Sequence, residues 1–193
     1  MRFDSMRPDV IRSIKQRWLL KYWAGLRDPY AIPRWTDLEF PEIASVSDAV
    51  NFLQVVETDG NLRFRIEFHG KSIGQAHGGA DCRGKFLDEV IPPAFMEPTM
   101  TTYRHAVASG LPIYTASDMR DPDGRLVHYE RLLLPFSGGG SKVDHVVGSL
   151  ETISPDGAFQ QRDLMGSARE PPRYRICGTI EPAAAMAAVE DRA

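Results

Sequence analysis

Residues 113–152 decide the fold, and they read IYTASDMRDPDGRLVHYERLLLPFSGGGSKVDHVVGSLET. The stretch contains three strand-like runs, at 113–120, 126–136 and 143–152. Two short turn sequences separate these runs, Asp-Pro-Asp-Gly and Ser-Gly-Gly-Gly. Because connections this short join antiparallel neighbours, the stretch predicts a three-stranded antiparallel meander.

Two further strands are predicted nearer the amino terminus, at 50–57 and 62–69. The Asp59-Gly60 pair between them suits a tight hairpin, because glycine tolerates the positive φ that such turns require. Glycine-rich residues then predict an irregular crossover, and residues 94–109 predict a helix that ends at Gly110. The chain is therefore predicted to be α+β, with five antiparallel strands and its helices gathered in the middle.

An additional amphipathic helix is predicted at residues 8–26. Its apolar face consists of Ile11, Ile14, Trp18, Tyr22 and Leu26. Its other face is basic, and we interpret that face as solvated rather than membrane-bound. We expect a homodimer through this helix, since it offers more apolar surface than one sheet edge buries, from Ile11, Ile14, Trp18, Tyr22 and Trp23.

The ordered unit is predicted to be one domain at residues 8–153, followed by a largely disordered tail at 154–193 that folding does not require. A short docked piece near residues 174–176 of this tail is left open. The 193 residues are 42% hydrophobic and 25% charged, which is typical of a globular protein. The net charge of -3 argues against nucleic acid as a partner. Without a signal peptide or a long apolar run, the expected location is the cytoplasm, with no membrane contact.

Convergent catalytic groups are missing from the sequence, so we predict that the chain is not an enzyme. It contains no nucleophile motif, phosphate loop or dinucleotide fingerprint. Cys82 and Cys177 are interpreted as free thiols, and the scattered histidines predict no metal site.

The order of elements resembles the PAS fold, and several motifs resemble a proteobacterial family of small stand-alone PAS-like proteins. These motifs are Pro33-Arg34-x-x-Asp37, Pro41-Glu42-Ile43, Arg63-Phe64-Arg65-Ile66, Gly70, residues 79–89 and residues 129–136. Arg83 departs from the family, which has threonine there, so a turn cap is expected to be absent. The resemblance implies a curved five-stranded antiparallel sheet that encloses a small-molecule cavity with the crossover helices.

Any ligand is expected between the helix at 94–109 and the last three strands, in a cavity of roughly 300 Å3 or more. The candidate ligand-binding residues are Met96, Met100, Tyr103, His128, Tyr129, Glu130 and Arg131. Because strand neighbours face opposite ways, either His128 and Glu130 or Tyr129 and Arg131 would face the ligand. Some PAS domains bind haem through a histidine on the helix that corresponds to 94–109. His105 lies near its carboxyl end, where a dipole interaction is favoured over haem, so the cofactor stays unknown.

Two functions fit these features. The first is a non-catalytic sensory domain that binds a small ligand and signals to an unidentified protein partner. The alternative is a ligand-free adaptor or dimerisation module that uses an exposed sheet face and the amphipathic helix. A filled interior would favour the adaptor.

Overall fold

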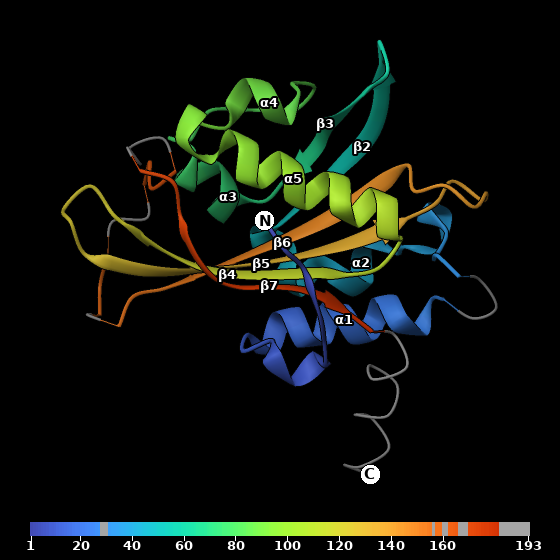
Figure 1. The fold of residues 1–193 in the computed structure, drawn as a ribbon, viewed down its shortest axis with the longest axis horizontal. Helices are drawn as coiled ribbons and strands as arrows, with labels where there is room; N and C mark the ends of the chain where they lie inside the picture. Colours follow the sequence, from blue (N-terminus) through green and yellow to red (C-terminus); the bar gives the residue numbers. More distant parts are fainter. Residues whose placement is uncertain (28–30, 156, 160–161, 166–169, 182–193) are drawn as a thin grey trace.

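The computed structural model describes residues 1–27, 31–155, 157–159, 162–165 and 170–181. Its centre is a seven-stranded sheet in the order β1-β7-β4-β5-β6-β2-β3 (Figure 1). The strands are β1 (Asp4–Met6), β2 (Val50–Thr58), β3 (Asn61–His69), β4 (Ile113–Arg120), β5 (Leu126–Phe136), β6 (His145–Ile153) and β7 (Arg173–Ile180). The β1–β7 pair is parallel and the other neighbours are antiparallel, so the sheet is mixed.

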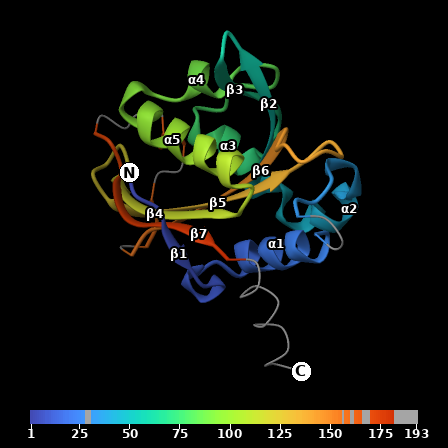
Figure 2. The same cartoon turned by 45° about the vertical axis from the view of Figure 1, so that its right-hand side comes forward.

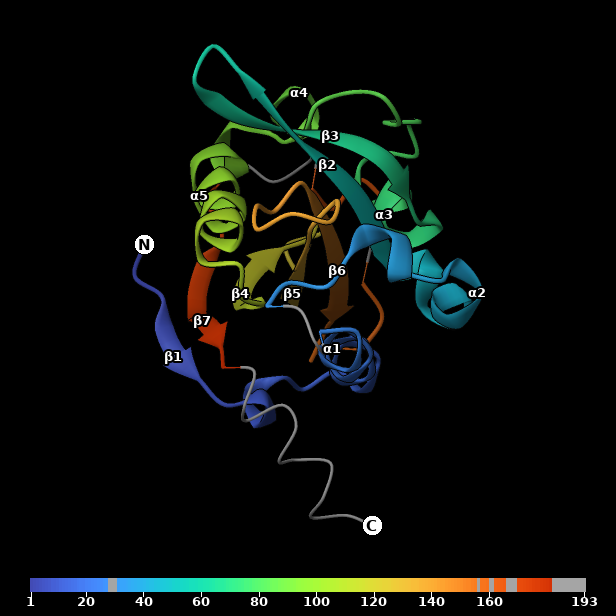
Figure 3. The ribbon, with the colours of Figure 1, turned by 90° about the vertical axis from the view of Figure 1, so that its right-hand side faces the viewer.

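Helices cover both faces of the sheet, as Figures 1 and 3 show. One face carries α3 (Lys71–Ala76), α4 (Leu87–Val90) and α5 (Pro93–Ser109). The other carries α1 (Ile14–Gly25), α2 (Phe40–Ile43) and the 3-10 turn Ala44–Ala49. The remaining 3-10 turns are Pro8–Val10 and Trp35–Asp37. The molecule thus has three layers, with the sheet in the middle.

The expectation of a five-stranded antiparallel sheet is wrong, because the sheet has seven strands and one parallel pair. The five predicted strands form its antiparallel part, β2 to β6, and β7 is added along β4. Within β7, Tyr174, Ile176, Gly178 and Ile180 alternate with more polar residues, but polar sequence precedes this short pattern. The segment predicted as a tail therefore supplies a strand, while residues 182–193 lie outside the described residues.

Two hydrophobic cores, one on each side of the sheet, follow from the alternation of side chains along the strands. Phe64, Phe95 and Leu133 belong to the core beneath α5. Trp23 and Leu132 belong to the core beneath α1. Because α1 covers the second face, that face is not exposed, and the sheet contact expected for an adaptor is not available there.

α1 runs along one face of the sheet (Figure 2), and side-chain hydrogen bonds fix it there. The Trp23 indole N–H donates to the Pro135 carbonyl at 2.7 Å, and the Gln16 amide donates to the carbonyls of Glu130 and Ser149. Ser13 caps the helix start by accepting from the Gln16 N–H. The α-helix starts at Ile14, later than the predicted residue 8, because residues 8–10 form a separate 3-10 turn.

At the turn where the family has threonine, Asp81 makes the cap. Its carboxylate accepts from the Arg83 backbone N–H at 3.0 Å and also pairs with the Arg83 guanidinium. These hydrogen bonds and the ion pair hold the pKa of Asp81 well below its usual range. The expected loss of a cap at this turn is therefore wrong, since an aspartate two residues earlier takes the role.

Candidate functional site

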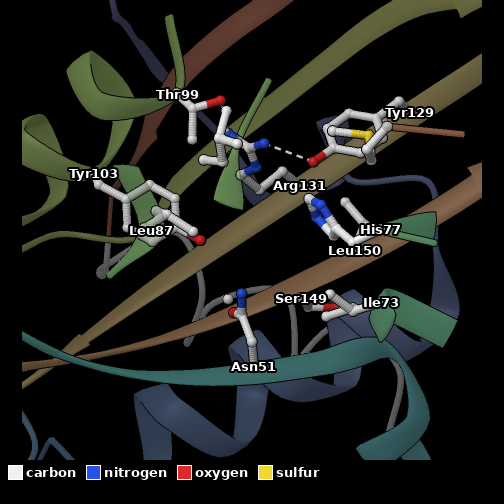
Figure 4. Close-up of a pocket in the computed structure, with 13 residues that line it drawn as sticks. Asn51, Ile73, His77, Leu87, Thr99, Tyr103, Tyr129, Arg131, Ser149 and Leu150 are labelled. Atoms are coloured by element: carbon white, nitrogen blue, oxygen red, sulfur yellow. Dashed lines mark hydrogen bonds between the residues drawn. The ribbon is translucent and has the colours of Figure 1, made fainter. Parts of the chain in front are cut away.

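A cavity of about 30 Å3 lies between α5 and the sheet (Figure 4). Its polar lining comes from β2, α5, β5, β6 and the residue that follows α3. The polar lining residues are Asn51, His77, Thr99, Tyr103, Tyr129, Arg131 and Ser149. A buried water needs about 10–15 Å3 by this measure, so the cavity holds about two waters. The space expected for a ligand of ordinary size is therefore mostly filled by side chains.

Arg131 is the most unusual residue of this cavity, because its charged side chain is only 6% exposed. It lies in the middle of β5, and its guanidinium donates to the Tyr129 hydroxyl at 2.6 Å and to the Thr99 hydroxyl at 3.4 Å. Burial lowers the pKa of Arg131, the neighbouring Tyr129, Tyr174 and Tyr103 raise it, and the net shift is upward. The site therefore contains a permanent positive charge.

His77, directly after α3, brings a second basic side chain to the cavity. Burial lowers its pKa to about 4, with further lowering by Arg131 and His69 and an opposing effect of Asp163. Its imidazole is therefore neutral at pH 7. Burial also raises the pKa of Tyr103, so that hydroxyl stays protonated and can donate a hydrogen bond.

The structure brings three of the predicted ligand-binding residues to the cavity wall: Tyr103, Tyr129 and Arg131. Met100 is buried in the same core and Met96 packs against it, but neither lines the cavity. His128 and Glu130 alternate with Tyr129 and Arg131 along β5, so they face away from the cavity. His128 instead contacts Asp118, with 2.7 Å between Nδ1 and Oδ1.

Sequence reasoning missed four polar lining residues: Asn51, His77, Thr99 and Ser149. Asn51 interrupts an apolar strand. Thr99 lies four residues before Tyr103, and this spacing places Thr99 and Tyr103 on one face of α5. These two signals were present in the sequence. His77 gave no such signal, because only the packing of α3 brings it to the cavity.

Glu130 lies on the face of the sheet that α1 covers, near Gln16, and it is 3% exposed. The strand register puts it directly opposite Glu151 on β6. Burial raises the pKa of Glu151, Lys15 lowers it and Glu130 raises it. The carboxyl groups therefore sit on the opposite side of the sheet from Arg131, and they do not neutralise it by direct contact.

His105, the residue considered for haem, does not line the cavity. Its ring stacks on Phe3 with 4.1 Å between centroids, and its Nε2 lies 3.1 Å from the Thr179 hydroxyl. It thus packs against the β1 and β7 side of the molecule. In the described residues, no three histidine, cysteine or acidic side chains are grouped to hold a metal ion.

A larger hollow of about 790 Å3 lies beside the β4–β5 turn. Its walls include Asp118, Arg120 and Asp121 on one side and Glu170 and Arg173 on the other. No helix among the residues described is both long and apolar enough to cross a bilayer.

Comparisons with known proteins find similar solved structures and one matching family model. The solved structures similar to this chain include the light state of the blue-light photoreceptor Aureochrome1 LOV, with 12% identity, a TM-score of 0.42, and 60% of this chain and 88% of that chain covered. Another is a Light-Oxygen-Voltage domain studied with a flavin analogue, with 12% identity, a TM-score of 0.44, and 60% and 84% covered. A third is the Vibrio cholera VqmA–ligand–DNA complex, with 13% identity, a TM-score of 0.42, and 61% and 52% covered.

No curated protein matches the chain. A sequence model of the PAS domain family, in contrast, matches residues 11–151, which include α1, both hairpins, the crossover helices and most of β6. This match covers well over half of the chain, and the chain therefore belongs to the PAS domain family.

Proposed function

We propose that this PAS domain is a non-catalytic signalling module that acts through protein contacts. The cavity combines one guanidinium, one neutral imidazole, hydroxyls and amides, and it brings no carboxylate base to a nucleophile among the described residues. Catalysis requires such groups to converge on one reacting atom. The polar groups present are therefore suited to binding rather than to chemistry.

The observation that carries this proposal is the size of the interior. About 30 Å3 between α5 and the sheet excludes haem, flavin and any ligand that needs roughly 300 Å3. A PAS domain whose interior is filled in this way transmits a signal through its surface. This favours the adaptor over a sensor of large ligands.

The outer face of α1 is the contact surface that we assign to this function. Ile14 is 77% exposed and Trp18 is 37% exposed, and the Trp18 ring stacks on Tyr22 with 5.6 Å between centroids. Single exposed apolar residues are common, but an exposed aliphatic side chain beside a stacked aromatic pair forms a local apolar patch. A protein partner, here a second copy of the chain, would cover this patch.

A second candidate function, the sensing of a very small ligand, is favoured by one observation. Arg131 is buried beside the cavity and its hydrogen bonds within the described residues go to neutral hydroxyls. This candidate concerns ligands of a few atoms, and it coexists with signalling through α1.

Native mass spectrometry and an absorption spectrum of protein purified from its own host test the main proposal. We expect no absorbing chromophore and no bound organic molecule of haem or flavin size. The control is the same protein after denaturation and refolding, which releases a trapped ligand. A stoichiometric bound mass in the first sample that is lost in the second would contradict the filled interior.

A further inference from the structure

The charge of Arg131 lacks a direct counter-ion within the described part of the chain. The side chain is 6% exposed, and its partners there are the Tyr129 and Thr99 hydroxyls. A buried charge ordinarily pairs with an opposite charge, because desolvation of an unpaired ion costs several kcal/mol. The nearest buried carboxyl along β5, Glu130, faces the other side of the sheet. The fold therefore keeps a cation in its interior without supplying its anion.

The cavity lies directly beside this cation. Figure 4 shows the Arg131 guanidinium at the cavity with Thr99 and Tyr103 on one side and His77 on the other. Asn51 approaches from β2. A hydroxyl and a side-chain amide can donate hydrogen bonds to an anion there, and a guanidinium matches the two oxygens of a carboxylate. The lining thus has the groups that hold a planar anion.

Gly148 on β6 keeps this space open. A Cβ atom placed at Gly148 would lie 3.0 Å from the Tyr103 hydroxyl and would collide with the Asn51 side-chain oxygen. That Asn51 oxygen is buried and has no hydrogen-bond partner among the described residues. Any larger residue at 148 would therefore displace the Asn51 amide and press against the Tyr103 hydroxyl.

We propose that the cavity beside Arg131 binds a small monocarboxylate of acetate size, which completes the missing ion pair. Space for about two waters admits three or four non-hydrogen atoms and excludes longer chains. The guanidinium favours a planar carboxylate over a spherical halide, because only the carboxylate accepts two parallel hydrogen bonds. This inference goes beyond signalling through α1, and either can fail without the other.

Thermal unfolding of the full chain in sodium acetate tests the proposal, with sodium gluconate at equal concentration as the size-excluded carboxylate. We expect a saturable increase of the Tm in acetate and none in gluconate, since a ligand that binds only the folded state stabilises it. Butyrate should give less than a tenth of the acetate affinity. An equal Tm in acetate and gluconate, or an equal effect of sodium chloride and acetate, would overturn the assignment.

Arg131→Met tests the role of the guanidinium, and Arg65→Met is the matched control at an exposed position on β3. We expect Arg131→Met to abolish the acetate response, whereas Arg65→Met should retain it. A full acetate response in Arg131→Met would overturn the proposal. If Arg131→Met does not fold, amide NMR spectra of the unaltered protein decide. Acetate but not gluconate should then shift the resonances of residues 130–132 and 148–150, and unchanged resonances would overturn the proposal.

Discussion

His77 and Arg131 line the same small cavity but differ in charge at neutral pH. The guanidinium keeps its proton because its intrinsic pKa is far above 7. The imidazole loses its proton because burial and the adjacent cation both disfavour a second positive charge. The interior thus contains one fixed charge and one group that titrates in mild acid.

Protonation of His77 should destabilise the fold between pH 6.5 and pH 4. The pKa of His77 is about 4 in the folded protein and 6.5 in the unfolded chain, so the unfolded chain binds more protons in this interval. Stability is therefore complete above pH 6.5 and falls as the pH decreases to about 4. This pKa difference corresponds to a loss on the order of 2–3 kcal/mol in the free energy of unfolding. Urea unfolding of the unaltered protein and of His77→Gln from pH 4.5 to 8 measures it.

The informative quantity is the difference in the free energy of unfolding between the unaltered protein and His77→Gln, measured as a function of pH. Above pH 7 the difference should be constant, because both proteins are then neutral at position 77. Below pH 6.5, His77→Gln should lose less stability than the unaltered protein. Parallel stability curves over the whole range would show that His77 titrates normally.

The strand β7 extends the sheet beyond β4 and carries the edge strand β1. It pairs with β4 from Ile113↔Thr179 to Asp118↔Arg173, and Ile180 is fully buried. Without β7, the backbone N–H and C=O groups on that side of β4 would be exposed as an edge. The segment therefore contributes to the domain although it lies after residue 154.

Truncation after Ser154 should lower stability, in contrast to the dispensable tail expected from sequence. Removal of a buried isoleucine such as Ile180 alone costs about 2–5 kcal/mol, and the exposed β4 edge favours aggregation. We expect a decrease of the Tm by at least about 5 °C. Truncation after Glu181 is the control and should leave the Tm within about 2 °C. Equal Tm values for both truncations would restore the original boundary.

The helix-rich middle and the strands β2 to β6 were predictable because local patterns determine them. The Asp59-Gly60 turn has φ values of 51° and 74°, as a tight hairpin requires, and α5 ends at Gly110 with a φ of 65°. β1 was not predictable, because three residues have no periodicity and their pairing depends on β7. Sequence reasoning identified Tyr103, Tyr129 and Arg131 as cavity residues. It could not decide which face of β5 lines the cavity, because that depends on which face α1 covers.

At the scale of the whole molecule, α1 covers one sheet face and presents its own outer face to solvent. Lys15, Arg17 and Lys21 are exposed on this helix together with Ile14 and Trp18. Ile11 and Trp23, which the sequence assigned to a dimer contact, are fully buried within the domain. The contact surface is consequently smaller and more basic than the sequence alone indicated.

A homodimer through α1 should be salt-dependent. The basic residues of two helices repel each other at low ionic strength, and salt screens this repulsion. We expect light scattering to show a greater dimer fraction at 0.5 M than at 0.05 M sodium chloride. The double substitution Ile14→Glu and Trp18→Glu should give a folded monomer under both conditions, with Arg65→Glu as the exposed control. A monomer at every concentration of the unaltered protein would exclude this dimer.

The parallel pair of β1 and β7 joins segments that are far apart in the chain, since Asp4 is the register partner of Gly178. Closing so long a loop costs conformational entropy before any contact is gained, and such non-local pairing slows folding. During synthesis, residues 4–6 leave the ribosome long before residues 178–180, with which they pair. The β2–β3 and β4–β5 hairpins can form while translation continues, whereas the β1 edge must wait until residues 178–180 have been made.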